Sequence, residues 1–175
     1  KADALQPGAT ARLEAKALKF HIEPCELRDM VGSSLQSLKD AIEKRKIIID
    51  IPDDCPEIHM DFVLMMRVFI NLVDNAIKYS RPDSTITIRA EHSDDKIRID
   101  VKDEGIGIPK DDVVKIFDKF YRAAKPHQIT GTGLGLSICK GIVELHKGEI
   151  FARNNPDLGV TMSVVLPLIR KEQES

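Results

Sequence analysis

The sequence predicts an α+β fold, a two-layer α/β sandwich in which one mixed, mostly antiparallel sheet carries its helices on one face. Apolar residues recur at helical spacing over residues 26–46 and 61–79. Two pairs of segments alternate apolar and polar residues as strands do, and a polar turn joins the two members of each pair. These paired segments are 84–91 with 96–103, and 149–153 with 160–168.

The N-terminal part of the chain begins with a short helical run. Residues 11–18 are good helix formers and predict the stub of a longer helix. A strand is expected over 19–24, ended by Pro24, and a second strand, 46–52, follows the helix over 26–46 and ends at Pro52. We expect three parts: a helix end and linker, a main domain and a C-terminal tail, at 1–18, 19–170 and 171–175.

The later elements have recognisable ends. Asp61 is placed to cap a long helix that runs to about Tyr79. A proline at 109 predicts another helix start, and residues 119–132 are polar and irregular. The last helix is expected over 133–146, with Gly148 as its C-cap.

Composition excludes several function classes. The apolar content of 42% and charged content of 31% are ordinary for a globular domain, and the net charge of −2 gives no electrostatic case for nucleic-acid binding. Three widely spaced cysteines predict reduced thiols rather than a disulfide framework or a zinc site. The apolar stretch 62–70 is too short to span a bilayer. Because the chain begins at Lys1, we expect a fragment, and a membrane segment could belong to its missing part.

The stretch TGTGLGLSICKGIVELHKG, residues 130–148, has glycine at 131, 133 and 135, just before a predicted helix. Its spacing is not that of a dinucleotide fingerprint, and the chain contains no Gly-Lys-Ser or Gly-Lys-Thr as a phosphate loop would require. Glycines nevertheless let backbone N–H groups approach a ligand, and a helix N-terminus favours anions. The stretch therefore indicates either a phosphate site of another design or a flexible, glycine-rich helix start.

A polar line runs along the otherwise apolar helix predicted over 61–79. At 100° per residue, Asn75 and Asn71 lie about 40° apart, and Lys78 and Arg67 lie close to the same line. The line is either a solvated helix face or a ligand site. Amide oxygens beside a lysine suit a magnesium-bound polyphosphate, because Mg²⁺ takes few protein oxygens and fills its shell from phosphates and water.

A third motif, DVKDEGIGIP, covers residues 100–109. Asp103 ends a predicted strand, and Gly105 and Gly107 then turn the chain. The motif is either an acidic turn or a base site, in which the carboxylate accepts hydrogen bonds from the exocyclic amine of a purine while the glycines leave room for the ring.

Together these stretches resemble the ATP-binding catalytic domain of sensor histidine kinases, in the superfamily of gyrase, Hsp90 and MutL-like ATPases. NLVDNAIKY resembles the N box, DEGIGIP the first glycine box, IFDKFYR the F box and GTGLGLSI the second glycine box. The motifs come in the family order and cover about residues 11–168. The resemblance implies the Bergerat fold with a mobile ATP lid at about 119–132. Within sensor kinases, the stretch 116–150 resembles the Kdp-type potassium sensor kinases.

The resemblance implies ATP and Mg²⁺ as ligands, and a role for each matching residue. Asn75 is expected to ligate Mg²⁺, with Asn71 beside the metal and triphosphate, and Lys78 and Tyr79 at the phosphates or sugar. Arg122 is expected to reach the γ-phosphate. The catalytic group is thus Asn71, Asn75, Lys78 and Arg122.

The resemblance also implies residues for the base, the lid and the phosphate cradle. Asp103 is expected to bind the adenine amine, with Thr161 joined to it through water. Phe117 and Phe120 are expected to anchor the lid. The base is expected to be lined by Gly105, Gly107 and Ile108, and the phosphates to be cradled by Gly131, Thr132, Gly133, Leu134, Gly135 and Leu136.

Two departures from related proteins refine this expectation. Related hydrolases carry a water-activating glutamate where this chain has Arg67, which favours phosphotransfer over hydrolysis. No histidine here lies in the H-E-x-x-[TN]-P context of a phosphoacceptor. We therefore expect the acceptor on a separate helical-hairpin dimerisation domain of the same kinase, and a response regulator as a further partner.

The expected whole protein is a homodimeric, membrane-associated kinase with this domain in the cytoplasm, the isolated domain being a monomer. Two alternatives stay open: a related ATPase of the DNA-repair or chaperone kind, and a pseudokinase that acts as an interaction module.

Overall fold

The structure, a computed structural model, describes residues 20–119, 121 and 135–169. Within these residues a five-stranded sheet has the order β2-β4-β5-β7-β6, and a separate small sheet pairs β1 with β3. The strands are β1 (Glu23–Cys25), β2 (Lys46–Asp50), β3 (Ile58–Met60), β4 (Thr85–His92), β5 (Lys96–Lys102), β6 (Glu149–Asn154) and β7 (Val160–Pro167). The helices are α2 (Leu27–Ser37), α3 (Lys39–Ile42), α4 (Phe62–Lys78), η2 (Lys110–Asp112), η3 (Lys115–Phe117) and α5 (Gly135–Leu145).

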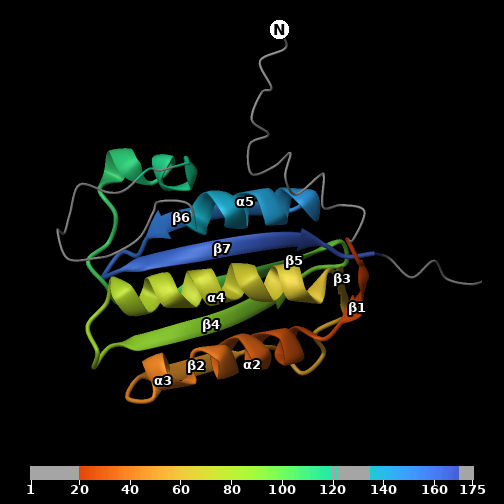
Figure 1. Ribbon diagram of the computed structural model, residues 1–175, viewed down its shortest axis with the longest axis horizontal. Helices are drawn as coiled ribbons and strands as arrows, with labels where there is room; N and C mark the ends of the chain where they lie inside the picture. Colours follow the sequence, from red (N-terminus) through yellow and green to blue (C-terminus); the bar gives the residue numbers. More distant parts are fainter. Residues whose placement is uncertain (1–19, 120, 122–134, 170–175) are drawn as a thin grey trace, which may run out of the picture.

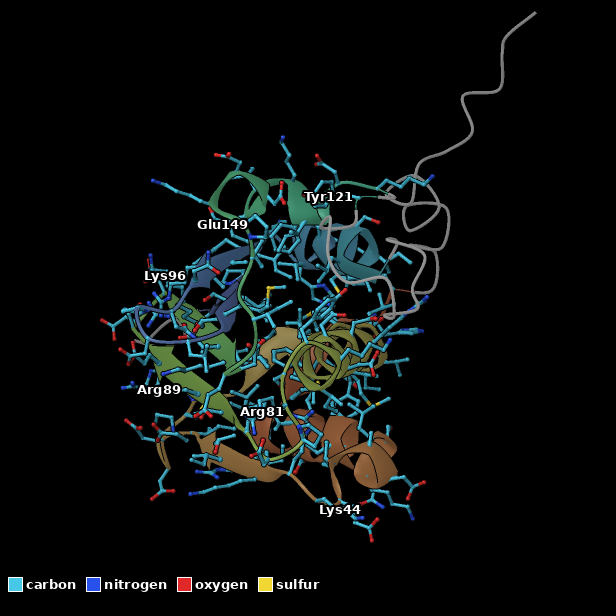
Figure 2. All side chains as sticks on the ribbon, turned by 90° about the vertical axis from the view of Figure 1, so that its left-hand side faces the viewer. Lys44, Arg81, Arg89, Lys96, Tyr121 and Glu149 are labelled. Carbon is cyan, nitrogen blue, oxygen red and sulfur yellow. The ribbon has the colours of Figure 1, made fainter. Side chains whose placement is uncertain are left out.

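The predicted fold class is confirmed. β2 pairs with β4 in parallel, and the other three pairings of the large sheet are antiparallel. α2, α4 and α5 cover one face of this sheet (Figure 1). Figure 2 shows the two layers from the side, with the labelled Arg89 and Lys96 on the strand side. No helix among the residues described is both long enough and apolar enough to cross a membrane.

The central helix α4 forms because its apolar residues share one face. Its buried residues recur every three or four positions along the helix, at Met65, Val68, Phe69, Leu72, Val73 and Ala76. They pack against the isoleucines of β4 and β5. Asp61 caps the helix as predicted, because its carboxylate accepts a hydrogen bond of 3.1 Å from the N–H of Leu64. Such a cap stabilises a helix by about 1 kcal/mol.

Several boundaries differ from the sequence prediction. The helix expected over 26–46 is two helices that break at Leu38, and Pro24 lies inside β1 instead of ending a strand. The partner of β1, β3, was not predicted; its three residues are too few for an alternation to stand out. The small sheet tolerates Pro24 because short edge strands can accommodate a residue without an N–H donor.

Two helix ends also differ. The helix expected after Pro109 is two short 3₁₀ turns, η2 and η3, because only Ile116 and Phe117 of this charged stretch are buried and no apolar face sustains an α-helix. At the end of α5, the left-handed residue is Lys147, with φ 59°, rather than Gly148. Gly148 is required there for another reason: a Cβ on it would lie 2.3 Å from the carbonyl oxygen of Val165.

A histidine joins the C-terminal end of α5 to the start of α4. His146 is buried; its Nδ1 lies 2.7 Å from the carbonyl oxygen of Ile142, and its Nε2 accepts a hydrogen bond of 3.0 Å from the N–H of Asp61. The ring of Phe20 packs edge-on against it at 5.0 Å. These bonds require a neutral ring with its proton on Nδ1, and burial lowers the pKa of His146 below its ordinary 6.5.

The domain is therefore expected to lose stability as the pH falls below about 6.5, since the unfolded chain then binds a proton that folded His146 resists. His146→Gln, which keeps an acceptor for Asp61, should reduce this loss. Chemical denaturation of both proteins at about pH 7.5 and about pH 5.5 measures the effect. An equal loss of unfolding free energy in both would contradict the assignment.

Candidate functional site

The polar line predicted on α4 lies partly exposed beside the core. Asn71 and Asn75 are half-buried, and the side chain of Asn71 donates a hydrogen bond of 3.2 Å to the carbonyl of Arg67. The side chain of Asn75 makes no hydrogen bond within the part of the chain that the structure describes. Lys78 forms an ion pair of 2.8 Å with Asp74, which leaves further ammonium donors for another partner.

The start of α5 lies directly beside this line. Gly135 is the first residue of α5, and a Cβ on it would lie 3.1 Å from Oδ1 of Asn71. One turn later, the buried thiol of Cys139 contacts the carbonyl oxygen of Val68 at 3.8 Å, and Leu136 packs against the core. Burial raises the pKa of Cys139 to about 12, so the thiol stays protonated. The end of the second glycine motif therefore meets the middle of α4.

Asp103 lies just beyond the end of β5, with a relative exposure of only 7%. Its Oδ1 accepts hydrogen bonds from the N–H groups of Gly105, at 2.8 Å, and Val160, at 3.1 Å. Burial raises the pKa of Asp103, and the two N–H donors and the Arg45 guanidinium partly offset that rise. Since both bonds end on Oδ1, Oδ2 is the oxygen left to accept a bond from a ligand.

The turn after Asp103 packs against the C-terminal end of α4. A Cβ on Gly105 would lie 2.2 Å from the carbonyl oxygen of Tyr79, so only glycine fits there. The same carbonyl accepts a hydrogen bond of 3.2 Å from the N–H of Ile106. Arg45 donates to the carbonyls of Ile77 and Ser80 and so fixes this helix end. One glycine motif thus meets α4 near its middle and the other at its end.

Thr161 is linked to Asp103 through a side chain that sequence reasoning missed. The predicted link through water stays a prediction. In the structure, Oγ1 of Thr161 donates to Oδ1 of Asn155 at 2.5 Å, and Nδ2 of Asn155 donates to the Asp103 carbonyl at 3.1 Å. The neighbouring Asn154 bonds to both main-chain groups of Ile108. In the sequence, the stretch from Asn154 to Gly159 suggested only a hairpin turn.

The remaining predicted residues divide into two groups. Phe117 is buried on η3, Ile108 packs against the core, and Gly107 has a left-handed φ of 76° that favours glycine. Tyr121 also packs against the core, and its hydrogen bond to Asp112 raises its pKa to about 12. The other predicted residues lie outside the described part of the chain: Phe120, Arg122, Gly131, Thr132, Gly133 and Leu134.

The donors near the site are amides rather than carboxylate or thiolate clusters. Among the described residues, no group of three or more His, Cys, Asp or Glu side chains could hold a metal ion. Asn71 and Asn75 can each supply a neutral oxygen. Such a donor set suits a hard cation that arrives with phosphate oxygens already bound.

The arrangement defines a nucleotide-binding class of protein: a sandwich whose central helix carries amide donors and meets both the start of α5 and the glycine turn after β5. Comparison with known proteins identifies the class. The family model described as histidine kinase-, DNA gyrase B-, and HSP90-like ATPase matches residues 60–170. The chain belongs to this family.

Its curated relatives are sensor kinases. The sensor protein KdpD of Escherichia coli is 38% identical over 157 residues, a match that covers 90% of this chain and 17% of KdpD. The sensor histidine kinase WalK of Bacillus subtilis is 40% identical over 169 residues, covering 94% of this chain and 28% of WalK. The chain thus spans under a third of the length of either relative. The KdpD match agrees with the Kdp-type resemblance of residues 116–150.

Solved structures support the same assignment. The mycobacterial sensor histidine kinase MprB superimposes with a TM-score of 0.77 at 26% identity, covering 83% of this chain and 97% of the other. The catalytic domain of histidine kinase ThkA gives a TM-score of 0.75 at 27% identity, covering 84% and 97%. The predicted ATP-binding catalytic domain of the sensor histidine kinase type is therefore confirmed.

Proposed function

We propose that the domain binds Mg-ATP and transfers its γ-phosphoryl group to a histidine on a separate helical-hairpin domain of the same kinase. The observation that carries the proposal is the placement of Gly135, the first residue of α5, at Asn71 and of the turn after β5 at Tyr79. A base held at one end and phosphates held near the middle of this helix would occupy one continuous site.

Asp103 supplies base recognition in this proposal. Because its Oδ1 is held by two main-chain N–H groups, the carboxylate is fixed before a ligand arrives. Its Oδ2 then accepts a hydrogen bond from the exocyclic amine of adenine. Gly105 keeps the turn close to the end of α4 and adds no side chain beside Asp103, while Gly107 lies close to the Asn154 side chain.

Asn75, Asn71 and Lys78 serve the phosphate end. The oxygen of Asn75 is the ligand proposed for Mg²⁺, and Asn71, one turn earlier on α4, lies beside the start of α5. Bound Mg²⁺ would neutralise phosphate charge and orient the γ-phosphoryl group. Lys78 adds a positive charge, and the N-terminus of α5 directs main-chain N–H groups towards an anion.

Arg67 favours transfer over hydrolysis. It is exposed on α4 one turn before Asn71, where related hydrolases carry a water-activating glutamate. A guanidinium group has hydrogen-bond donors and no acceptor, so an arginine cannot act as a general base. The chain's own residues then contribute orientation and charge stabilisation.

The proposed partners follow from this reaction. They are the dimerisation and phosphoacceptor domain, and a cognate response regulator that receives the phosphoryl group. The whole kinase is proposed to be a membrane-associated homodimer with this domain in the cytoplasm, and the isolated domain a monomer.

Two experiments test the proposal. Calorimetric titration of the domain with Mg-ATP should show binding, and absence of binding would favour a pseudokinase. Incubation of the domain with a separately expressed acceptor hairpin and γ-labelled ATP should place the label on the hairpin. Label that appears only as free phosphate would favour an ATPase.

Asn75→Ala is expected to weaken Mg-ATP binding by about tenfold or more, since a metal ligand is lost while the half-buried position tolerates alanine. Titrations with and without Mg²⁺ should show that the loss falls mainly on the metal-dependent part of the affinity. Val63→Ala, at an exposed position of the same helix, is the control. An unchanged affinity in Asn75→Ala would remove this residue from the site.

A further inference from the structure

Two adjacent asparagines at the β6–β7 turn hold the proposed base-binding segment at both ends. Asn154 faces the main chain of Ile108: the Ile108 N–H donates to Oδ1 at 2.8 Å, and Nδ2 donates to the Ile108 carbonyl at 2.6 Å. The side-chain amide therefore pairs with both main-chain groups of one residue, as a residue of a neighbouring strand does in an antiparallel sheet. The two residues are 46 positions apart in the sequence.

Asn155 holds the other end of the segment. Its Nδ2 donates to the carbonyls of Asp103 and Leu158, both at 3.1 Å, and its Oδ1 accepts from Thr161. Gly159 completes this contact, because a Cβ on it would lie 2.1 Å from the Asp103 carbonyl oxygen. Asp103 is thus positioned by the turn through its main chain as well as through its carboxylate.

The folding of the sheet brings these groups to one end of the molecule. β5 ends at Lys102, which pairs with Thr161 at the start of β7, and Asn154 pairs with Val160. The β6–β7 turn and the chain leaving β5 consequently lie at the same edge, beside the C-terminal end of α4, at the left of Figure 1. The turn faces the protein segment between Asp103 and Ile108.

We propose that Asn154 and Asn155 are positioning residues that fix the segment 103–108 and so determine how tightly the domain holds the adenine base. This inference deepens the proposed function and rests on it. Asn154 carries the sharper test, because it is exposed and its side-chain hydrogen bonds to the described residues are both with Ile108, so that removing its side chain leaves the core intact.

Asn154→Ala should remove both hydrogen bonds to the main chain of Ile108. The backbone at Gly107, a glycine that already has a positive φ, could then adopt other conformations. The affinity for Mg-ATP is expected to fall by about three- to tenfold, as the loss of ordered hydrogen bonds predicts. Binding of Mg-tripolyphosphate, which lacks a base, should not change. Asn154→Asp keeps an acceptor for the Ile108 N–H but sets an oxygen against the Ile108 carbonyl, so it should weaken ATP binding at least as much.

The experiment is calorimetric titration of each variant with Mg-ATP and with Mg-tripolyphosphate, together with thermal unfolding and amide hydrogen exchange of the nucleotide-free domain. Exchange at the Ile108 N–H should become about tenfold faster in Asn154→Ala, while exchange at Val101 in β5 stays constant. Asp157→Ala, at an exposed position of the same turn, is the matched control and should match the wild type in every measurement.

The outcomes separate this inference from the proposed function. Failure of the wild-type domain to bind Mg-ATP would overturn the proposed function. If the wild type binds and Asn154→Ala binds equally well, the positioning role is wrong. A variant that loses ATP and tripolyphosphate affinity in parallel, with a lower unfolding temperature, would show that Asn154 acts only on stability and would also overturn the inference.

Discussion

Asp103→Asn is expected to abolish specific ATP binding while leaving the domain folded. Asparagine keeps the oxygen that accepts from Gly105 and Val160, but its amide nitrogen replaces Oδ2 and sets a donor against the adenine amine. Loss of a hydrogen bond to a charged group costs about 1.5–3 kcal/mol, or about 10- to 200-fold in affinity. Because burial already raises the pKa of Asp103, removing its charge should not destabilise the fold.

Calorimetry with Mg-ATP and with Mg-inosine triphosphate, in which a carbonyl replaces the amine, measures the effect. The affinity of the variant for Mg-ATP should fall, and its affinity for Mg-inosine triphosphate should rise relative to that for Mg-ATP. The affinity of the wild type for ATP should fall as the pH falls through the pKa of Asp103, which lies above the ordinary 3.8 of aspartate. The protonated carboxyl group is a weaker acceptor for the hydrogen bond from the adenine amine. Unchanged ATP affinity in Asp103→Asn would exclude this residue from base recognition.

Gly105→Ala is expected to damage both the fold and the site. Its Cβ would lie 2.2 Å from the Tyr79 carbonyl oxygen and 3.0 Å from Oδ1 of Asp103, so the turn must leave the end of α4. Overpacking of this kind costs about 1–3 kcal/mol of folding free energy. Displacement of this turn should also lower the affinity of the domain for ATP, since Asp103 lies at the start of the turn.

Gly32→Ala is the matched control for that change. Gly32 lies inside α2, and among the described residues no atom beyond the adjoining residues and the backbone of α2 lies within 4 Å of the Cβ that alanine would add. Alanine there should raise the unfolding free energy by about 0.5–1 kcal/mol, because it restricts the unfolded chain and favours helix. Urea denaturation of both variants checks the contrast; a destabilised Gly32→Ala, or a Gly105→Ala as stable as wild type, would contradict the packing described.

The sequence predicts the fold well where local patterns are long. α4 spans 17 residues, is capped by Asp61, and repeats its apolar face several times, so its bounds could be read directly. The two hairpins of the sheet alternate over enough residues to be found. In contrast, β1 and β3 are three residues each, and only their pairing with one another makes them strands.

Some residues of the site could also be predicted from local patterns, and others could not. The line of Asn71, Asn75 and Lys78 follows from helical periodicity, and Asp103 from its place at a strand end. The roles of Asn154 and Asn155 depend on contacts with residues about 50 positions away, which no local pattern encodes. Asparagine before a turn is common for purely local reasons, so its identity there carries little information on long-range contacts.

One nucleotide is expected to contact the middle of α4, the start of α5 and the turn after β5 together. The most direct measurement is an NMR titration of the isotope-labelled domain with Mg-ATP. The Asn71 and Asn75 side-chain amides and the backbone amides of Gly105 and Leu136 should shift together, while Ile48 on β2 does not shift. Shifts confined to either the turn after β5 or the start of α5, or centred on β2, would contradict this site.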